Sequence, residues 1–356
     1  MGKTYKAAIY QDKGRIDIVE KQLPEACGER EVIVKNRIAT ICGADFASYM
    51  RGDGDAHMLW SGYEFGHEMV SEVVAAGENV EGVEVGDWLF PNLGYAHRDH
   101  HRMATVGGFS EYLVFPDFSL EGSCAMGSRN QPSAFKLDKS LGLENLCLIE
   151  PFSVGTKAAF SLQPKGKTAV VIGAGIIGLS TAVMLKYYGA EKVMILDFSE
   201  FRLKNARDYG ILTCNPVRED LDEKLYGEFG ETYAYGGKKC GADLFIDCIG
   251  IQPSIDYFAG YAGVGATLCI VGTHDGKDPT FPANSVCFNQ QKIVGCGSLP
   301  MDRCVEDICG LIKSGVALAP LITQKYPLEQ IGEAMEILKD TEAAQKVAIV
   351  YGGDKE

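Results

Sequence analysis

The sequence predicts an α/β protein of two domains, a mostly β, partly open barrel followed by a doubly wound parallel sheet. Three observations support this prediction. The chain has 356 residues, which is more than one typical hydrophobic core accommodates. Short apolar segments separated by glycine-containing turns dominate as far as about residue 115. From Thr168 onward, apolar runs alternate with helical patterns, as in a parallel sheet covered by helices.

The first domain is expected to consist of strands and turns. Residues 31–38 alternate apolar and polar side chains with the period of a half-buried strand, and residues 69–76 predict a second strand. Shorter strands are expected at residues 88–90 and 111–115. Residues 117–133 are rich in glycine and serine and show little periodicity, so we expect a substrate lid, an oligomer contact or a disordered loop there.

The second domain is expected to start with the apolar run at residues 169–172, as a strand buried on both faces would. Strands and helices then alternate with short connections. The expected helices of this alternation are residues 176–188, 200–209 and 255–261, and its further strands are residues 192–196, 242–247, 267–271 and 292–295. A helix at residues 154–162 is expected before it, and a helix at residues 302–313 and a strand at residues 346–351 are expected after it. We place the domains at residues 1–152, 153–298 and 299–356, with the last segment partly returning to the first domain.

A glycine motif lies between the first strand and the first helix of the second domain. It has the form G-x-G-x-x-G and comprises Gly173, Gly175, Ile176, Ile177 and Gly178 around Ala174. The first glycine permits a tight turn, the second lets the backbone approach a pyrophosphate, and the third lets helix and strand pack closely. The free N–H groups of the helix N-terminus favour phosphate. The motif therefore predicts a Rossmann-type dinucleotide site.

An acidic residue ends the next strand. Asp197 lies nineteen residues after Gly178, where a carboxylate accepts hydrogen bonds from ribose hydroxyls and repels a 2′-phosphate. Arg202, five residues further on, could accept such a phosphate. We predict NAD rather than NADP as the cofactor, bound by Asp197 and Arg202 with the glycine loop.

Four residues of the types that bind zinc are candidates for a metal site. Cys42, His67, Glu68 and Glu150 supply thiolate, imidazole and carboxylate ligands, and three of these with one open position make a catalytic zinc site. Their wide separation in the chain excludes a zinc finger. Because such spacing is not diagnostic, the residues alone leave the metal site open.

Several motifs resemble those of the zinc-dependent medium-chain dehydrogenase/reductase superfamily, nearest its sorbitol and threonine dehydrogenase branch. Glu150-Pro151 is similar to the Glu-Pro of that branch, where alcohol dehydrogenases carry Cys. The resemblance covers essentially the whole chain. The other matching motifs are Cys42-Gly43-x-Asp45, Gly66-His67-Glu68 with Gly77 and Val80, Val85-Gly86-Asp87, and residues 107–112.

The resemblance implies a GroES-like first domain and one catalytic zinc on Cys42 and His67. Glu68 and Glu150 would be direct or water-mediated ligands, and which of them binds directly stays open. Asp45 would hold the second nitrogen of His67. The cofactor cleft would be lined by Val154, Cys248, Ile249, Val271, Gly272 and Thr273. The implied reaction transfers hydride between NAD and a secondary alcohol, with a polyol or sugar alcohol as the expected substrate.

The sequence departs from the family at the residues that relay the alcohol proton. Ala44 and Ala47 stand where the family usually has a hydroxyl residue and often a histidine. Ser48 is the candidate replacement, and Tyr49, His57 or zinc-bound water beside Glu68 or Glu150 could also serve.

The second departure concerns the structural zinc. The four cysteines that hold it in many relatives are missing, and His97, Asp99, His100 and His101 occupy that lobe. The three histidines could bind a metal, but a solvated loop facing the pocket or a subunit is favoured. Because the cysteines are missing, we predict one zinc per chain and no structural zinc.

The substrate pocket allows a second interpretation. Trp60, with Met58 and Leu59 beside it, and Tyr95 and Phe118 are candidates for its lining, and an apolar approach would suit a bulky alicyclic or steroid-like alcohol. A core role for Trp60 is equally compatible. The chain could also be a non-catalytic NAD-binding relative or a zinc-free quinone reductase, but the complete ligand set disfavours both.

Charge and composition restrict the partners. The net charge of −14 argues against nucleic acid and anionic membrane. No apolar run is long enough to span a bilayer. The twelve cysteines lack framework spacing, and the N-terminus shows no export signal, so we expect reduced thiols. We therefore predict a cytoplasmic protein. Together with the reaction that the resemblance implies, we predict small-molecule alcohols as its substrates and a homodimer or homotetramer as its assembly.

Overall fold

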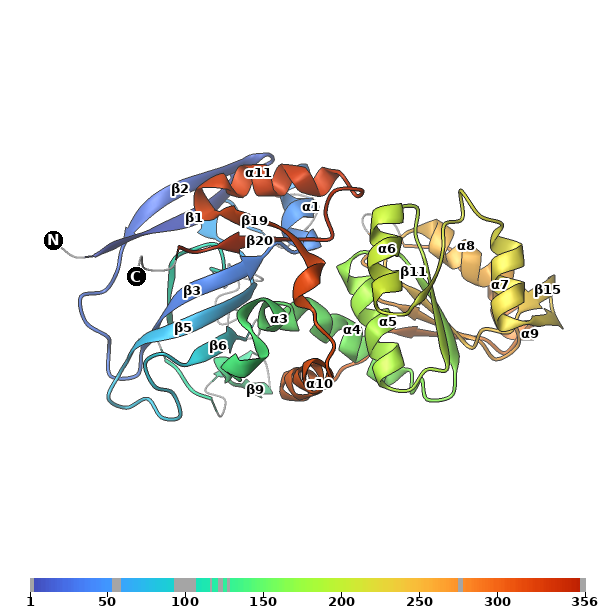
Figure 1. Cartoon of the computed structure of the whole chain (residues 1–356), viewed down its shortest axis with the longest axis horizontal. Coiled ribbons are helices and arrows are strands. Elements are labelled where there is room, and N and C mark those ends of the chain that lie inside the picture. Colours follow the sequence, from blue (N-terminus) through green and yellow to red (C-terminus); the bar gives the residue numbers. More distant parts are fainter. Residues whose placement is uncertain are drawn as a thin grey trace. The chain divides into compact units, whose positions relative to one another are not determined.

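The computed structural model describes residues 3–52, 59–92, 107–115, 117–120, 124–126, 129–274 and 278–352. The chain divides into two compact units (Figure 1). Unit 1 comprises Met1–Glu150, Ile312–Asp340 and Lys346–Glu356. Unit 2 comprises Pro151–Leu311 and Thr341–Gln345. The chain thus enters unit 2 once for most of its residues and again for one short strip near its C-terminus.

Two β-sheets contain most of the described strands of unit 1. The larger has seven strands in the order β10-β6-β5-β3-β20-β19, with β7 paired to β3, and the smaller has the order β2-β1-β4. The strands are β1 Thr4–Asp12, β2 Arg15–Gln22, β3 Val32–Thr40, β4 Tyr63–Glu64, β5 Glu68–Ala76, β6 Trp88–Pro91, β7 Tyr112–Phe115, β10 Ala134–Lys136, β19 Ile322–Pro327 and β20 Lys346–Val350. Together they confirm the predicted GroES-like, mostly β domain.

The alternation expected around residues 31–38 positions the core of unit 1. In β3, Val32 and Val34 are fully buried, and they pack with Val73 of β5 and Phe115 of β7. Strand β3 pairs antiparallel with β5 over Val32–Thr40, so its C-terminal end lies beside the first residue of β5. This register brings Thr40 opposite Glu68. The metal-ligand candidates therefore lie at the end of a well-packed strand pair.

Helices of unit 1 were largely missed from the sequence. The helix α1 spans Gly43–Arg51, directly after Cys42, where only strands and turns were expected. In the described part of unit 1, the remaining helical segments are α3 Leu143–Cys147, the start of α4 Ile149–Ser161, α11 Ile331–Glu336 and the 3-10 turns Lys139–Leu141, Ala319–Leu321, Leu328–Gln330 and Ile337–Lys339. Within residues 117–133, the described part forms a short antiparallel hairpin, β8 Cys124–Met126 with β9 Arg129–Gln131.

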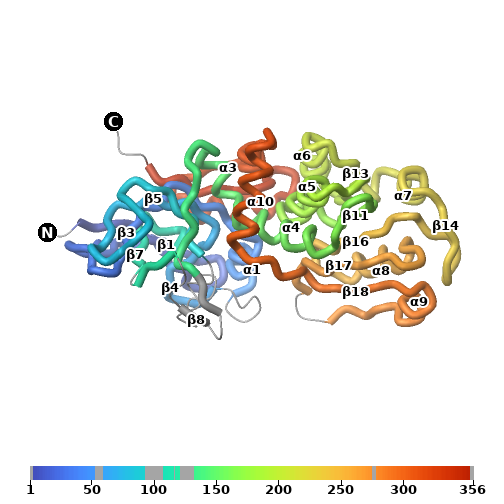
Figure 2. Tube along the Cα trace, turned by 90° about the horizontal axis from the view of Figure 1, so that it is seen from below, coloured from blue at the N-terminus to red at the C-terminus, as the bar shows by residue number. Residues whose placement is uncertain are grey.

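Unit 2 confirms the predicted doubly wound parallel sheet. Its six strands run parallel in the order β13-β12-β11-β16-β17-β18, and Figure 2 shows β16, β17 and β18 side by side. The strands are β11 Thr168–Ile172, β12 Lys192–Leu196, β13 Leu212–Cys214, β16 Leu244–Asp247, β17 Thr267–Ile270 and β18 Lys292–Gly295. The order reverses between β11 and β16, which makes the carboxyl ends of these strands the expected ligand edge.

The helices of unit 2 alternate with its strands. They are α5 Ile176–Tyr187, α6 Glu200–Asp208, α7 Leu221–Phe229, α8 Gln252–Tyr261, α9 Ala283–Phe288 and α10 Met301–Lys313. Helix α8 starts earlier than predicted because Pro253 fits its first turn. Strand β13, helices α7 and α9, and the hairpin β14 Glu231–Ala234 with β15 Gly237–Cys240 were not predicted. In the described part of the chain, no helix has the length and apolar character needed to cross a membrane.

Candidate functional site

Cys42 caps the N-terminus of α1. Its backbone is extended, its Sγ accepts a hydrogen bond from Ala44 N at 3.5 Å, and Asp45 completes a capping box by accepting from Cys42 N at 3.2 Å. Because an N-cap residue must leave the helical path, the thiol is held at the helix start, close to free N–H groups. The helix therefore fixes both Cys42 and Asp45 at one point.

His67 and Glu68 follow a glycine that no other residue could replace without strain. Gly66 has a φ of +92°, and a Cβ there would lie 2.7 Å from the ring of Phe109. Its carbonyl accepts hydrogen bonds from the N–H groups of Gly107 and Gly108 at 3.1 and 2.9 Å. This tight turn directs the two residues into the interior at the start of β5, where both are buried.

Three of the predicted ligands converge in unit 1. The ligand atoms of Cys42, His67 and Glu68 all lie within 4.8 Å of one another. Burial raises the pKa of the Cys42 thiol, reinforced by the charge of Glu68. Burial by itself lowers the pKa of His67, but the negative charges of Asp45 and Cys42 outweigh it and raise that pKa well above the usual value. Crowded anionic groups around one point suit a divalent cation, and thiolate with imidazole and carboxylate suits zinc.

Asp45 faces His67. Its Oδ1 lies 3.6 Å from His67 Nδ1, while its Oδ2 serves the cap of α1. Asp45 is fully buried, and among the described residues its Oδ1 has no hydrogen-bond partner. Burial raises the pKa of Asp45 to about 6. A carboxylate in this position can fix the orientation and tautomer of a ligating histidine.

Glu68 has two partners that sequence reasoning missed. Lys346 of β20 places its Nζ 2.8 Å from Oε1 and 2.6 Å from Oε2, and the Thr40 hydroxyl donates to Oε2. Burial lowers the pKa of Lys346, but the charge of Glu68 outweighs this and raises it. No local motif marks Lys346, because it lies 278 residues from Glu68 in the chain.

Glu150 lies in the first turn of α4 and is buried. Its carboxylate is not in the group whose ligand atoms lie within 4.8 Å of one another. Its charge nevertheless contributes to raising the pKa of both His67 and Lys346. Glu150 therefore influences the cluster of Cys42, His67 and Glu68 through its negative charge, although its carboxylate is not one of the three converging groups.

Ser48, the predicted proton-relay residue, lies on α1 and is buried. Its backbone carbonyl accepts from the Tyr10 hydroxyl at 3.0 Å, and its own Oγ has no hydrogen-bond partner among the described residues. Ser48 and Asp45 are three residues apart, which places them on one face of the helix. His57, also named as a possible relay, lies outside the described residues.

Of the residues predicted to line the substrate pocket, Trp60 and Phe118 lie in the described part of the chain. Trp60 is 45% exposed, whereas Phe118 packs edge-on against Phe115 in the core of unit 1. The core contact accounts for the burial of Phe118 without a substrate. Met58, Tyr95 and the histidine-rich stretch His97, Asp99, His100 and His101 lie outside the described residues.

The glycine loop of unit 2 has the geometry that a phosphate site needs. Gly173 has a φ of +99°, and a Cβ at Gly178 would collide with the Gly173 carbonyl. Gly175 is the N-cap of α5 without a side-chain cap, and a Cβ there would meet nothing within 4 Å. The N–H groups of the first helical turn, including Ile176 and Ile177, therefore start at an open surface.

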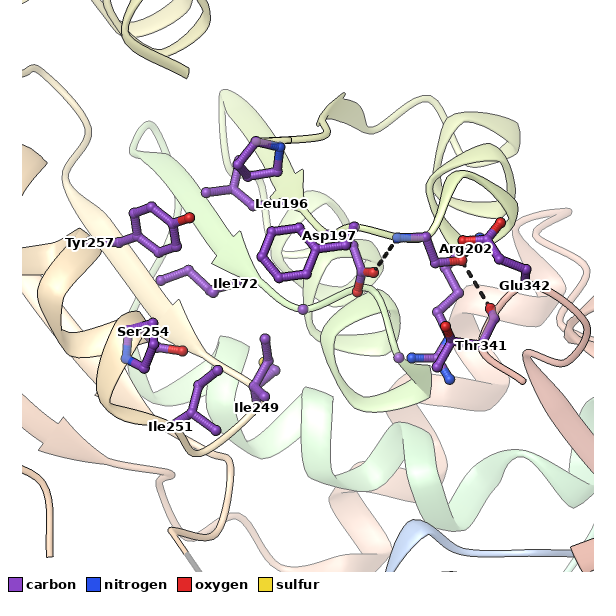
Figure 3. Close-up of a pocket in the computed structure, with 17 residues that line it drawn as sticks. Ile172, Leu196, Asp197, Arg202, Ile249, Ile251, Ser254, Tyr257, Thr341 and Glu342 are labelled. Carbon is purple, nitrogen blue, oxygen red and sulfur yellow. Dashed lines mark hydrogen bonds between the residues drawn. The ribbon is translucent and has the colours of Figure 1, made fainter. Parts of the chain in front are cut away.

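A pocket of about 580 Å³ lies beside this loop, within the range of small-molecule sites. Asp197, Arg202, Thr341 and Glu342 gather at one end of it, opposite Tyr257 (Figure 3). The remaining lining residues are Ile172, Gly173, Gly175, Leu196, Phe198, Ser199, Pro216, Cys248, Ile249, Ile251, Pro253 and Ser254. Gly173, Gly175, Asp197, Arg202 and Ile249 thus share one cavity, whereas Gly178, Ile176 and Ile177 are not part of its lining.

The polar end of the pocket combines the carboxylates of Asp197 and Glu342 with the guanidinium group of Arg202. Asp197 accepts from Ala174 N at 2.6 Å and from Ser199 N at 2.8 Å. Burial lowers the pKa of Arg202, although Asp197 and Glu342 oppose this, and its Nε has no partner among the described residues. Glu342 was missed because it comes from the distant strip Thr341–Gln345, where no pattern links it to the cofactor.

Val271 and Thr273, which were also predicted to contact the cofactor, follow β17. Val271 N donates to the Asp247 carbonyl at 2.9 Å, and the Thr273 carbonyl contacts Gly250. Neither lines the pocket beside Asp197. They lie at the carboxyl end of β17, which pairs with β16 on the other half of the sheet.

Comparison with known proteins identifies both halves of the chain. The family model described as "Alcohol dehydrogenase GroES-like domain" matches residues 28–121, and the model described as "Zinc-binding dehydrogenase" matches residues 177–308. A curated relative, L-threonine 3-dehydrogenase of Caldanaerobacter subterraneus subsp. tengcongensis, is 30% identical over 341 residues, which cover 90% of this chain and 92% of the relative.

Solved structures share the fold across almost the whole chain. The crystal structure of 2R,3R-butanediol dehydrogenase from Bacillus subtilis superposes with a TM-score of 0.79 at 22% identity, covering 98% of this chain and 100% of that one. Galactitol-1-phosphate dehydrogenase from Escherichia coli gives a TM-score of 0.76 at 21% identity, covering 97% and 100%. At these identities, the two structures establish the fold of the chain.

Proposed function

The chain belongs to the zinc-dependent alcohol dehydrogenase family, within the medium-chain dehydrogenases and reductases, and from that membership we propose that it oxidises a polyol or sugar alcohol with NAD. The observation that supports this most strongly is the convergence of Cys42, His67 and Glu68 within 4.8 Å. The reaction also requires a site for NAD, and the pocket between the glycine loop and Asp197 is the candidate for it. In the reaction, the carbinol carbon gives a hydride to NAD and the hydroxyl loses a proton.

A single zinc ion per chain would be held by Cys42, His67 and Glu68, with Glu150 as the further carboxylate. Zinc supplies Lewis acidity, which lowers the pKa of an alcohol hydroxyl toward neutrality. Asp45 would orient His67 through Nδ1, at the 3.6 Å separation found here. Lys346 and Thr40 hold the Glu68 carboxylate in place and balance its charge. These contacts preorganise the ligand set.

The acids at the polar end of the pocket support NAD rather than NADP. Asp197 and Glu342 both line the cavity where the cofactor's adenosine ribose would lie. A 2′-phosphate there would face two carboxylates, and Arg202 between them would be its only cationic partner along this pocket lining. Two negative groups against one positive group favour a ribose with free hydroxyls.

The proton released by the alcohol needs a route that Ala44 and Ala47 do not offer. We propose Ser48, whose buried Oγ has no partner among the described residues and lies one helical turn from Asp45. The test is the pH–rate profile of Ser48→Ala. A profile identical to that of the parent enzyme would exclude Ser48 from the relay.

The substrate class is proposed from the branch of the family. Glu150-Pro151 stands where alcohol dehydrogenases carry Cys, as in the polyol branch. A second candidate is an amino alcohol, because the relative at 30% identity is named L-threonine 3-dehydrogenase, and threonine carries a secondary hydroxyl at its carbon 3.

We further propose that the enzyme is a homo-oligomer in the cytoplasm.

One screen tests the proposed function. NAD reduction is followed across polyols, amino alcohols and bulky alicyclic alcohols, with zinc content measured on the same sample. Turnover of a polyol with NAD by zinc-loaded protein supports the proposal. Turnover of L-threonine alone would select the second candidate, and zinc-loaded protein that reduces no NAD with any alcohol would contradict both.

A further inference from the structure

A buried carboxylate lies at the carboxyl end of β16, on the half of the sheet beyond the switch point. Asp247 is fully buried. Its Oδ1 accepts hydrogen bonds from the N–H groups of Ile249 and Gly250 at 3.0 and 2.9 Å. These bonds lock the turn after β16. Oδ2 is left to point toward the neighbouring strand end.

His274 occupies that neighbouring strand end. Its Nε2 lies 2.9 Å from Asp247 Oδ2, and its side chain is 12% exposed. Because an ionised carboxylate only accepts, Nε2 of the neutral ring carries the hydrogen and Nδ1 is an acceptor. In the described part of the chain, Nδ1 makes no hydrogen bond. The carboxylate thus fixes both the ring orientation and the tautomer of a partly accessible histidine.

The two strand ends form one rigid surface. A Cβ on Gly250 would collide with the Thr273 carbonyl, and a Cβ on Gly272 would collide with the Gly250 amide nitrogen. Gly272 N also donates to the Asp247 carbonyl at 2.9 Å. The turns after β16 and β17 are therefore packed backbone against backbone, which holds His274 in position relative to Asp247.

The position of the dyad on the sheet indicates which part of a dinucleotide it meets. A doubly wound sheet binds one mononucleotide half on each side of its switch point, which here lies between β11 and β16. Asp197 marks the adenosine half at the end of β12. His274 lies on the opposite half, and it is not part of the pocket lining beside Asp197. Ile249 links the two sites, because its side chain lines that pocket and its N–H bonds Asp247.

We propose that His274, held by Asp247, accepts a hydrogen bond at Nδ1 from a hydroxyl of the ribose attached to nicotinamide. The proposal rests on the proposed NAD-dependent function. It assigns to His274 a direct contact with the cofactor, and to Asp247 the role of positioning that contact. A histidine serving only to satisfy the buried carboxylate would not need its second nitrogen, so the two roles can be separated by substitution.

Two matched variants of His274 separate its bond to Asp247 from its proposed bond to the ribose. The side-chain amide of His274→Gln reaches the position of Nε2, so it keeps a donor to Asp247 and loses the acceptor at the δ position. His274→Asn has the reverse effect, with an amide oxygen at the δ position and no donor to Asp247. Dissociation constants are measured for NADH, ADP-ribose and AMP with the zinc-loaded enzyme, and thermal unfolding is recorded alongside. AMP carries the adenosine half alone.

We expect His274→Gln to raise the dissociation constants of NADH and ADP-ribose by roughly twofold to tenfold, which corresponds to the loss of one net hydrogen bond. The dissociation constant of AMP should stay unchanged. His274→Asn should bind ADP-ribose more tightly than His274→Gln while unfolding at a lower temperature. Equal affinity of His274→Gln and the parent for all three ligands, or an equal loss for AMP, would overturn the ribose contact. A parent enzyme that binds none of the three would instead contradict the proposed NAD-dependent function.

Discussion

Lys346 and Glu68 form a buried ion pair, with Lys346 Nζ 2.6 Å from Oε2 and 2.8 Å from Oε1 of the carboxylate. Their side chains are only 3% and 1% exposed. The pair connects the last strand of unit 1 with the first residue of β5, next to His67. Because an unpaired charge in such surroundings is costly, the pair is expected to matter more for stability than any exposed ion pair of the chain.

Replacing Lys346 by Met should destabilise the enzyme by about 3 kcal/mol, since Glu68 is left buried without a cation. Urea unfolding measures the difference. The double variant with Glu68→Gln should recover part of the loss. Lys325→Met serves as the control, because its pair with Glu144 is exposed and should contribute less than about 1 kcal/mol. A loss no larger than that of the control would contradict the importance of the buried pair.

Replacing Cys42 by Ser should abolish zinc retention and activity together, because a hydroxyl is a poor substitute for a thiolate ligand. Metal analysis after dialysis gives the readout. Cys287→Ser is the control, since Cys287 is an exposed thiol in unit 2. Prolonged chelation of the parent should have the same effect as the Cys42 substitution, and added zinc should reverse it. Unchanged zinc content in the Cys42 variant would remove this residue from the ligand set.

Asp45→Asn should weaken zinc binding by roughly tenfold to a hundredfold without changing the ligand set. The neutral amide no longer favours a defined tautomer of His67, although it can still cap α1. Competition with a chromogenic chelator measures the affinity. Circular dichroism checks that α1 is retained. Zinc affinity equal to that of the parent would mean that Asp45 serves only as a helix cap.

Asp197→Asn should shift cofactor preference toward NADP by about tenfold in the ratio of kcat/KM values, because one of two carboxylates at the ribose loses its charge. Adding Glu342→Gln should shift the ratio further in the same direction. Asp208→Asn, on the exposed side of α6, is the control and should leave the ratio unchanged. If the Asp197 variant kept the parent's ratio, the carboxylate would not be what excludes NADP.

Local patterns predicted the sheet of unit 2 well. A buried parallel strand followed by glycines and a helix is encoded within a few residues, so the expected and observed bounds of β11 and β12 differ by at most one residue. Helix α1 was missed because cysteine is an unusual N-cap and the segment follows a strand without a recognised start signal. The strand β13 and the hairpin after α7 carry too few apolar positions for periodicity to mark them.

The residues of the candidate site also fall into those that local motifs predicted and those that they missed. Cys42, His67 and Glu68 were predicted to belong to one site because their motifs resemble those of the family, and the structure brings their ligand atoms together. Lys346, Thr40 and Glu342 were not, because their roles arise from strand pairing and chain return over long sequence separations. His274 had no motif at all, and only its 2.9 Å contact with Asp247 distinguishes it.

The strip Thr341–Gln345 affects whether unit 2 can be transferred between proteins as one continuous segment. Gln345 donates to the Ala174 carbonyl at 3.0 Å, the Thr341 carbonyl accepts from Ser199, and Glu342 accepts from Phe201 N. The C-terminal part of the polypeptide therefore helps to support the glycine loop and the start of α6. A cofactor domain grafted as one continuous stretch, Pro151–Leu311, would lack that support. Exchange of the complete domain between relatives, by recombination or by design, requires crossovers on both sides of Thr341–Gln345 in addition to those on both sides of Pro151–Leu311.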